Sequence, residues 1–172
     1  MKTLSVYAFG IDAFKFPEDI YTLLQMQRRG FNHFGKSEDP KIHERTLFMQ
    51  KDILDHLLHP NVLKRITNTK LYGNRYSLAE FIKDLTNAIF KSDLNTSVNS
   101  FRQNLQIEYV NRLVKIIQPK GKDAYDHISK SMALYHLKKI EKMQLTARSP
   151  DDATKAHRQH ILFLIEKAVE QR

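Results

Sequence analysis

The sequence contains no cysteine and no tryptophan, and only 5 glycines and 5 prolines occur among its 172 residues. Without cysteine, disulfide bonds, cysteine-ligated zinc sites and thiol nucleophiles are all excluded. Neither a G-x-x-x-x-G-K-[ST] loop nor a G-x-G-x-x-G motif is present. The longest uncharged run near the start, Thr3 to Ile11, is far shorter than the roughly 20 apolar residues that cross a bilayer. We therefore expect a domain with its own hydrophobic core, no membrane span and no secretion signal.

Positive charge is in excess, with a formal net charge of +9, so nucleic acid or an anionic surface is the first partner to consider. A surface that follows a phosphate backbone normally concentrates lysine and arginine on one face. Here the longest basic runs are the pairs Arg28-Arg29, Lys64-Arg65 and Lys138-Lys139, which are typical of solvated helix surfaces. We do not expect nucleic acid as the main partner, and we keep a basic nucleic-acid-binding or protein-interaction module as the alternative function.

Helix signals recur along the whole chain. Caps and first-turn prolines mark helix starts at Asp39-Pro40 and at Ser149-Pro150-Asp151-Asp152, and Ser77 with Glu80 has the spacing of a capping box. The predicted helices cover residues 17–30, 39–60, 60–68, 77–90, 98–117, 125–143 and 149 onward. Only Leu4 to Phe9 has the pattern of a short strand, and residues 1–12 are alternatively a poorly ordered arm. The sequence thus predicts an all-α fold, a compact bundle of six or seven helices. We expect an irregular N-terminal arm at residues 1–16, which forms the junction with a missing upstream domain. A single helical domain is expected at residues 17–172.

Apolar residues at helical spacing predict which side chains enter the core. In the second helix they are Ile42, Leu47, Met49, Ile53, Leu54, Leu57 and Leu58. In the helix at 98–117 they are Phe101, Leu105, Tyr109, Leu113 and Ile116. In the helix at 125–143 they are Ile128, Met132, Leu134 or Tyr135, and Ile140. In the last helix they are Ile161, Leu164, Ile165 and Ala168.

Eight histidines raise the question of a metal site. His56 and His59 are three residues apart on a predicted helix, as are His157 and His160, and such pairs share a helix face. A closed zinc site needs four ligands, and no carboxylate stands at helical spacing to complete either pair. We therefore predict helix-end or exposed histidines and assign no metal ligand.

Catalytic motifs are also missing from the sequence. His43-Glu44 is the only His-Glu pair, and the position that HExxH requires to be histidine is Leu47. No serine lies in a G-x-S-x-G turn. We assign no catalytic or cofactor-binding residue, and an independent hydrolase remains only a third hypothesis.

Two groups of side chains could either contact a partner or serve a structural role within the fold. Arg102, Asn104 and Gln106 either contact a partner's backbone or tie their helix to adjoining loops, and buried polar groups favour the second interpretation. Five phenylalanines form either a docking surface or a lid on the core: Phe9, Phe14, Phe16, Phe31 and Phe34.

Four stretches resemble the C-terminal region of large bacterial zinc-dependent metalloproteases, zincin-type enzymes with an HExxHxxGxxH motif and flanking domains of unknown function. They are QRRGFNHFGKSEDPKIHER at 27–45, the segment ILDHLLHPNVLKRITNTKLYGNRYSLAEFIKDLTNAIF at 53–90, NSFRQNLQIEYVNRLVKII at 99–117 and TKAHRQHILFLIEKA at 154–168. The resemblance runs from about residue 15 to the end, and FRQNLQIEYV is its most specific part.

The resemblance implies that the intact protein is an exported, periplasmic or cell-surface peptide hydrolase that uses one zinc ion. The HExxH helix is absent from this chain, so no catalytic or metal residue can be transferred to it. We expect a chain that is inactive alone, binds no peptide substrate itself, and packs against and stabilises the catalytic domain of the same protein.

Overall fold

The computed structural model describes residues 39–68, 83, 85–87, 89, 90, 97–118 and 125–171. Every regular element in these ranges is a helix, which confirms the all-α prediction. The helices with defined bounds are α3 (Pro40–Leu57), α4 (Pro60–Asn68), α6 (Ser100–Ile117), α7 (His127–Thr146) and α8 (Asp152–Glu170). Residues 83, 85–87 and 89 are also helical. The predicted arm, the possible strand, the first helix and the five phenylalanines lie outside the described residues.

Side-chain caps set where four of these helices begin. Asp39 accepts a hydrogen bond from the amide of Lys41 at 3.0 Å, and Pro40, the first residue of α3, needs no donor. Asn99 caps α6 and Asp126 caps α7, each accepting from the amide three residues later at 2.8 Å. Asp151 caps α8 through the amide of Thr154 at 2.7 Å.

Two of the sequence-based helix boundaries were wrong. The last helix was expected to open at Ser149 with Pro150 in its first turn, but Asp151 is its cap, so both residues precede it. The reason is that the Asp151 carboxylate accepts the Thr154 amide, the bond that a cap must make. Similarly, α7 begins at His127 and not near Tyr125, because Asp126 makes the capping bond there.

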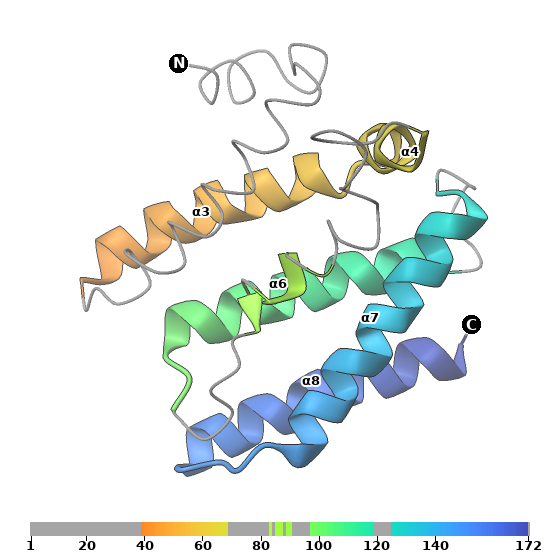
Figure 1. Cartoon of the computed structure of the whole chain (residues 1–172). Coiled ribbons are helices and arrows are strands. Elements are labelled where there is room, and N and C mark those ends of the chain that lie inside the picture. The colour runs from red at the N-terminus through yellow and green to blue at the C-terminus, as the bar shows by residue number, and fades with distance from the viewer. Residues whose placement is uncertain are drawn as a thin grey trace.

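Helix α6 lies at the centre of the bundle, with α3 on one side and α8 on the other, while α7 crosses in front of both α6 and α8 (Figure 1). Helix α6 packs against α3, α7 and α8, and α7 also packs against α8. The predicted stripe of α6 is buried as expected: Phe101, Leu105, Tyr109, Leu113 and Ile116. Full burial of one such leucine contributes about 2 kcal/mol of hydrophobic free energy.

The remaining core residues come from every neighbouring helix. From α3 and its end they are Ile53, Leu54, Leu57 and Leu58, and from α8 Ile161 and Ile165, as predicted. Leu47, Leu164 and Ala168 are partly buried against them. None of the helices that the structure describes combines the length and apolar content of a membrane span.

The inward face of α7 differs from the predicted one. Ile128 and Tyr135, two of the candidates for the core, are 50% and 59% exposed. The inward face consists instead of Ser129, Ala133, His136, Leu137, Ile140 and Gln144. Ile140 is buried, and Met132 and Leu134 pack against the core, as predicted. The prediction was wrong for Ile128, because small and polar side chains occupy much of this face.

Candidate functional site

His56 and His59, the first histidine pair, are engaged with the backbone at the junction of α3 and α4. His56 Nδ1 lies 2.8 Å from the carbonyl oxygen of Asp52, one turn earlier in the same helix. His59 Nδ1 accepts a hydrogen bond from the amide of Asn61 at 3.1 Å, within the first turn of α4. Each imidazole thus satisfies backbone groups near a helix end, in agreement with the predicted structural role.

The second pair, on α8, is divided between the core and the surface. His157 is 5% exposed, whereas His160 is an exposed residue. Residues three apart lie on the same side of a helix. Here, however, His157 lies in the core and His160 lies outside it.

His157 forms part of a buried chain of hydrogen bonds between three segments. Gln106 on α6 donates from Nε2 to the carbonyl oxygen of Ile89 at 3.1 Å, which fixes its side-chain oxygen as an acceptor. His157 Nε2 lies 2.7 Å from that oxygen, so this nitrogen carries the proton and donates. A protonated nitrogen has no lone pair for a metal ion, and in this arrangement His157 Nε2 is a structural donor.

A second buried polar group joins α6 and α7 to residue 86. Thr86 Oγ1 lies 2.7 Å from Tyr109 Oη and 3.4 Å from His136 Nδ1. Burial raises the pKa of Tyr109, so its hydroxyl is neutral and its proton stays in the hydrogen bond. Burial, together with the positive charge of Lys139, lowers the pKa of His136 to about 4.

Burial is also the main reason that the pKa of His157 falls to about 4, with the nearby His160 and Arg158 acting in the same direction. Both buried imidazoles are therefore neutral at pH 7. Both side chains are buried, and each lies within hydrogen-bonding distance of a group on another segment. We conclude that His136 and His157 hold helices together.

The beginning of α8 is fastened to two separate segments. Ser97 Oγ donates to the Asp151 carboxylate, and the amide of Val98 donates to Thr154 Oγ1 at 3.2 Å. The Ser97 hydroxyl and the Thr154 amide lower the pKa of Asp151. These bonds attach the chain that enters α6 to the first turn of α8.

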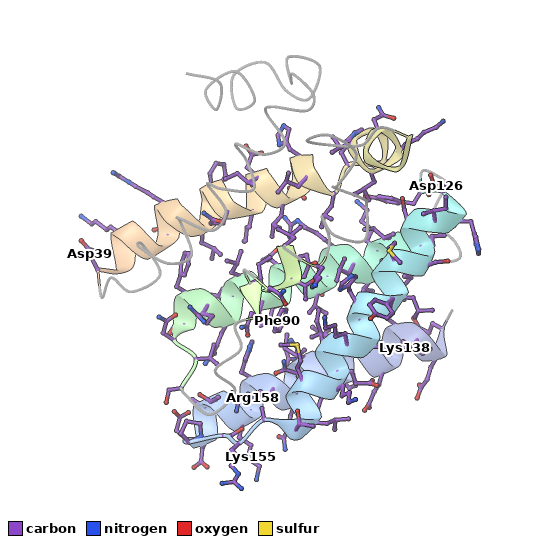
Figure 2. All side chains as sticks on the ribbon, in the orientation of Figure 1. Asp39, Phe90, Asp126, Lys138, Lys155 and Arg158 are labelled. Atoms are coloured by element: carbon purple, nitrogen blue, oxygen red, sulfur yellow. The ribbon has the colours of Figure 1, made fainter. Side chains whose placement is uncertain are left out.

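Arg158 fastens the same end of α8 to the connection from α7 (Figure 2). Its Nη1 donates to the carbonyl oxygen of Arg148 at 2.7 Å and to Ser149 Oγ at 3.0 Å. The guanidinium is used inside the fold, and burial lowers its pKa. It is not presented as an anion-binding group on the surface.

An ionic cluster joins α3 to α6 on the opposite side of the bundle. Arg112 donates from Nε to Asp55 Oδ1 and from Nη1 to Glu108 Oε2, each at 2.7 Å. Lys51 Nζ lies 3.3 Å from Glu108 Oε1. Although burial alone would lower it, the two carboxylates raise the pKa of Arg112. Because the cluster is half exposed, each pair contributes no more than about 1 kcal/mol.

The polar residues singled out in FRQNLQIEYV fall into two groups. Gln106 ties its helix to Ile89 and His157, as the structural interpretation predicted. Gln103, from the same segment, donates to the carbonyl oxygen of Val98 at 2.8 Å. Asn104 is exposed, and burial lowers the pKa of the half-buried Arg102. Sequence reasoning missed Thr86 and His136, because nothing near them in the sequence marks their partners.

The described residues do not fit a zinc ion. Within residues 39–68, 97–118 and 125–171 and the six positions described between 83 and 90, no three histidine, aspartate or glutamate side chains form a group suited to a metal. Four ligands, or three and a water, are the usual requirement of zinc. His56, His59 and His157 each take part in a hydrogen bond given above, and His160 is exposed.

Comparison with known proteins assigns the chain to a family. The sequence model of a family described as Met-zincin matches residues 1–97, more than half of the chain. This range contains the resembling stretches at 27–45 and 53–90, but those at 99–117 and 154–168 lie beyond it. No curated protein and no solved structure matches the chain. The chain belongs to the Met-zincin family, a metalloprotease-related family.

Proposed function

We propose that this chain is a non-catalytic helical domain from the C-terminal region of a bacterial zinc-dependent metalloprotease. The observation that carries the proposal is membership of the Met-zincin family in a chain whose only His-Glu pair, His43-Glu44, is followed by Leu47 where HExxH needs histidine. The zinc ion and the peptidase chemistry belong to other parts of the intact protein. The role of this chain is to pack against the catalytic domain and to stabilise it.

The construction of the fold supports a mechanical role. Helix α3, within the family-matched range, shares one core with α6, which lies beyond that range. The Arg112 cluster and the bond from Tyr125 Oη to the carbonyl oxygen of Leu58 at 2.9 Å also cross between the two ranges. The described helices of the matched segment, α3 and α4, therefore pack against α6 and α7, which lie beyond it.

Cellular location forms part of the same proposal. The resembling metalloproteases are exported, so we place the intact protein outside the cytoplasm, in the periplasm or at the cell surface. Fractionation of cells that express the intact protein, with immunoblotting of this domain, tests the placement. Recovery in the cytoplasmic fraction would contradict it.

Deletion from the intact metalloprotease tests the function itself. The full-length enzyme is compared with one that lacks residues 39–171, by peptidase activity and by the melting temperature of the catalytic domain. We expect both to fall, because the catalytic domain loses a packing partner. A point variant, Leu105→Ala, should lower both in a smaller degree, with Asn104→Ala as the exposed neighbouring control. Unchanged activity and melting temperature after the deletion would refute the proposal.

A further inference from the structure

Helix α7 exposes large apolar side chains along the side that faces away from the core. Ile128, Tyr135 and Leu145 are 50%, 59% and 66% exposed. In the part of the chain that the structure describes, two other large apolar residues are as exposed, Phe48 on α3 and Phe163 on α8. Each is the only such residue that the structure describes on its helix. Phe163 has Lys167 Nζ 5.9 Å from its ring centroid, which partly covers it. Only α7 therefore shows several of these side chains on one described helix.

These residues belong to one band that is about 100° wide and runs along α7. At about 100° per residue, positions separated by three, four or seven residues lie on the same helix face. We define the α7 outer stripe as Ile128, Ser131, Tyr135, Lys138, Lys142 and Leu145, all of which are exposed. Because α7 crosses over α6 and α8, this side is turned away from both neighbours (Figures 1 and 2). With a rise of about 1.5 Å per residue, the stripe is about 25 Å long.

The charge of α7 is strongly one-sided. The helix contains four lysines and one glutamate. Lys138 and Lys142 stand on the stripe between the apolar side chains, while Glu141 is half-buried on the flank. Two exposed lysines among exposed apolar groups are complementary to a surface that is both anionic and apolar.

We propose that the α7 outer stripe binds the surface of an anionic phospholipid membrane, with α7 lying parallel to the membrane plane. The apolar side chains enter the boundary between headgroups and acyl chains, and the lysine ammonium groups remain among the phosphates. Tyrosine is a residue that this boundary favours. The contact is peripheral and involves no membrane span.

A lipid surface fits the stripe better than a protein partner does. A specific protein contact needs about 800 Å² on each side and hydrogen-bonding groups that fix its register. The stripe is one helix wide, and its only polar groups besides the lysines are the hydroxyls of Ser131 and Tyr135. Membrane binding needs only apolar side chains and positive charge distributed along the helix, which is what α7 offers.

Vesicle flotation of the whole chain tests the proposal. The probes are vesicles of equal parts phosphatidylglycerol and phosphatidylcholine, and vesicles of phosphatidylcholine alone. We expect binding to the anionic vesicles, weaker binding at high salt, and little binding to the neutral ones. The double variant Lys138→Gln, Lys142→Gln should lose about fivefold in affinity for each lysine removed. The double variant Tyr135→Ser, Leu145→Ser should lose about tenfold or more.

Matched controls change the same kinds of side chain elsewhere on the surface. Phe48→Ser removes a more exposed apolar side chain from α3, and Lys64→Gln with Lys83→Gln removes two exposed lysines outside α7. Both controls should bind as the wild type does, and circular dichroism confirms that each variant is folded. Absence of binding to anionic vesicles overturns the proposal. An equal loss of affinity in the α7 variants and in the controls overturns it as well. So does a chain that does not bind vesicles but whose α7 outer stripe is protected by an acidic amphipathic peptide.

Discussion

Mild acid should destabilise this fold through its two buried histidines. His136 and His157 are 2% and 5% exposed, and each has a pKa of about 4 because burial disfavours the charged imidazole. In the unfolded chain the same groups have the ordinary value near 6.5. As pH falls from about 6.5 to about 4, the unfolded state therefore binds protons that the folded state does not. The free energy of unfolding must decrease over this range.

The size of the effect follows from the displacement of the two pKa values. Between pH 7 and pH 5, a histidine displaced from 6.5 to about 4 loses about 2 kcal/mol of stabilisation, and about 1 kcal/mol if solvent screens the new charge. The pair should therefore cost about 2 to 4 kcal/mol. The carboxylates with lowered pKa values, Glu108 and Asp151, stabilise the fold above their ordinary values near 4. The stabilisation that these carboxylates provide is lost mainly below those values. It therefore contributes little to the change between pH 7 and pH 5.

Urea unfolding followed by circular dichroism at pH 7 and pH 5 measures the difference. His157→Gln keeps a donor toward Gln106, and His136→Asn keeps a polar group toward Thr86, so each should remove about half of the pH dependence. His127→Gln, which alters an exposed imidazole on α7, should leave it unchanged. Equal or greater stability at pH 5 would refute the reasoning. Full pH dependence in the double variant of His136 and His157 would refute it too.

Three further substitutions test the packing and capping. Leu105→Ala, at a fully buried position of α6, should lower the free energy of unfolding by about 3 kcal/mol in urea titrations, because it leaves a cavity. Thr86→Val should cost about 2 kcal/mol in the same assay by removing the partner of the buried Tyr109 hydroxyl, and Thr86→Ser should restore most of it. Asp126→Ala should cost about 1 kcal/mol by removing the cap of α7, whereas Asp126→Asn keeps an acceptor; equal losses in both would contradict the capping argument.

Local signals were sufficient to place the described helices to within a few residues and to predict the core faces of α3, α6 and α8. The predicted stripe of α6 is buried from Phe101 to Ile116, because large apolar residues recur there at every turn. Asp39 and Pro40 mark the start of α3 through chemistry confined to the first turn. Information of this kind is contained in a few neighbouring residues, so one sequence is enough to read it.

The register of α7 and the buried polar groups depend on contacts between distant residues. His136 enters the core because Thr86, 50 positions away, meets its imidazole. His157 enters the core because Gln106, 51 positions away, accepts a hydrogen bond from its imidazole. Periodicity alone favoured Ile128 for the core of α7, since an apolar side chain is the better candidate when its neighbours are unknown. The structure instead pairs the polar side chains and leaves Ile128 exposed.

The resemblance predicted a zincin-type, metalloprotease-related family, and the Met-zincin match over residues 1–97 confirms this part of the prediction. It placed its most specific residues at FRQNLQIEYV, which lies beyond that range. In the structure this segment supplies the central helix of the core and the Gln106 hydrogen bonds. Packing and hydrogen bonding within the fold account for its buried residues.

Metal content and peptidase activity of the purified chain test the central claim most directly. The chain is incubated with zinc, desalted, and analysed by mass spectrometry for bound metal and by a fluorogenic peptide mixture for hydrolysis. A helical domain without catalytic residues should retain far less than one zinc ion per chain and show no hydrolysis above background. One tightly held zinc ion per chain, with peptide hydrolysis that a chelator abolishes and zinc restores, would contradict the account.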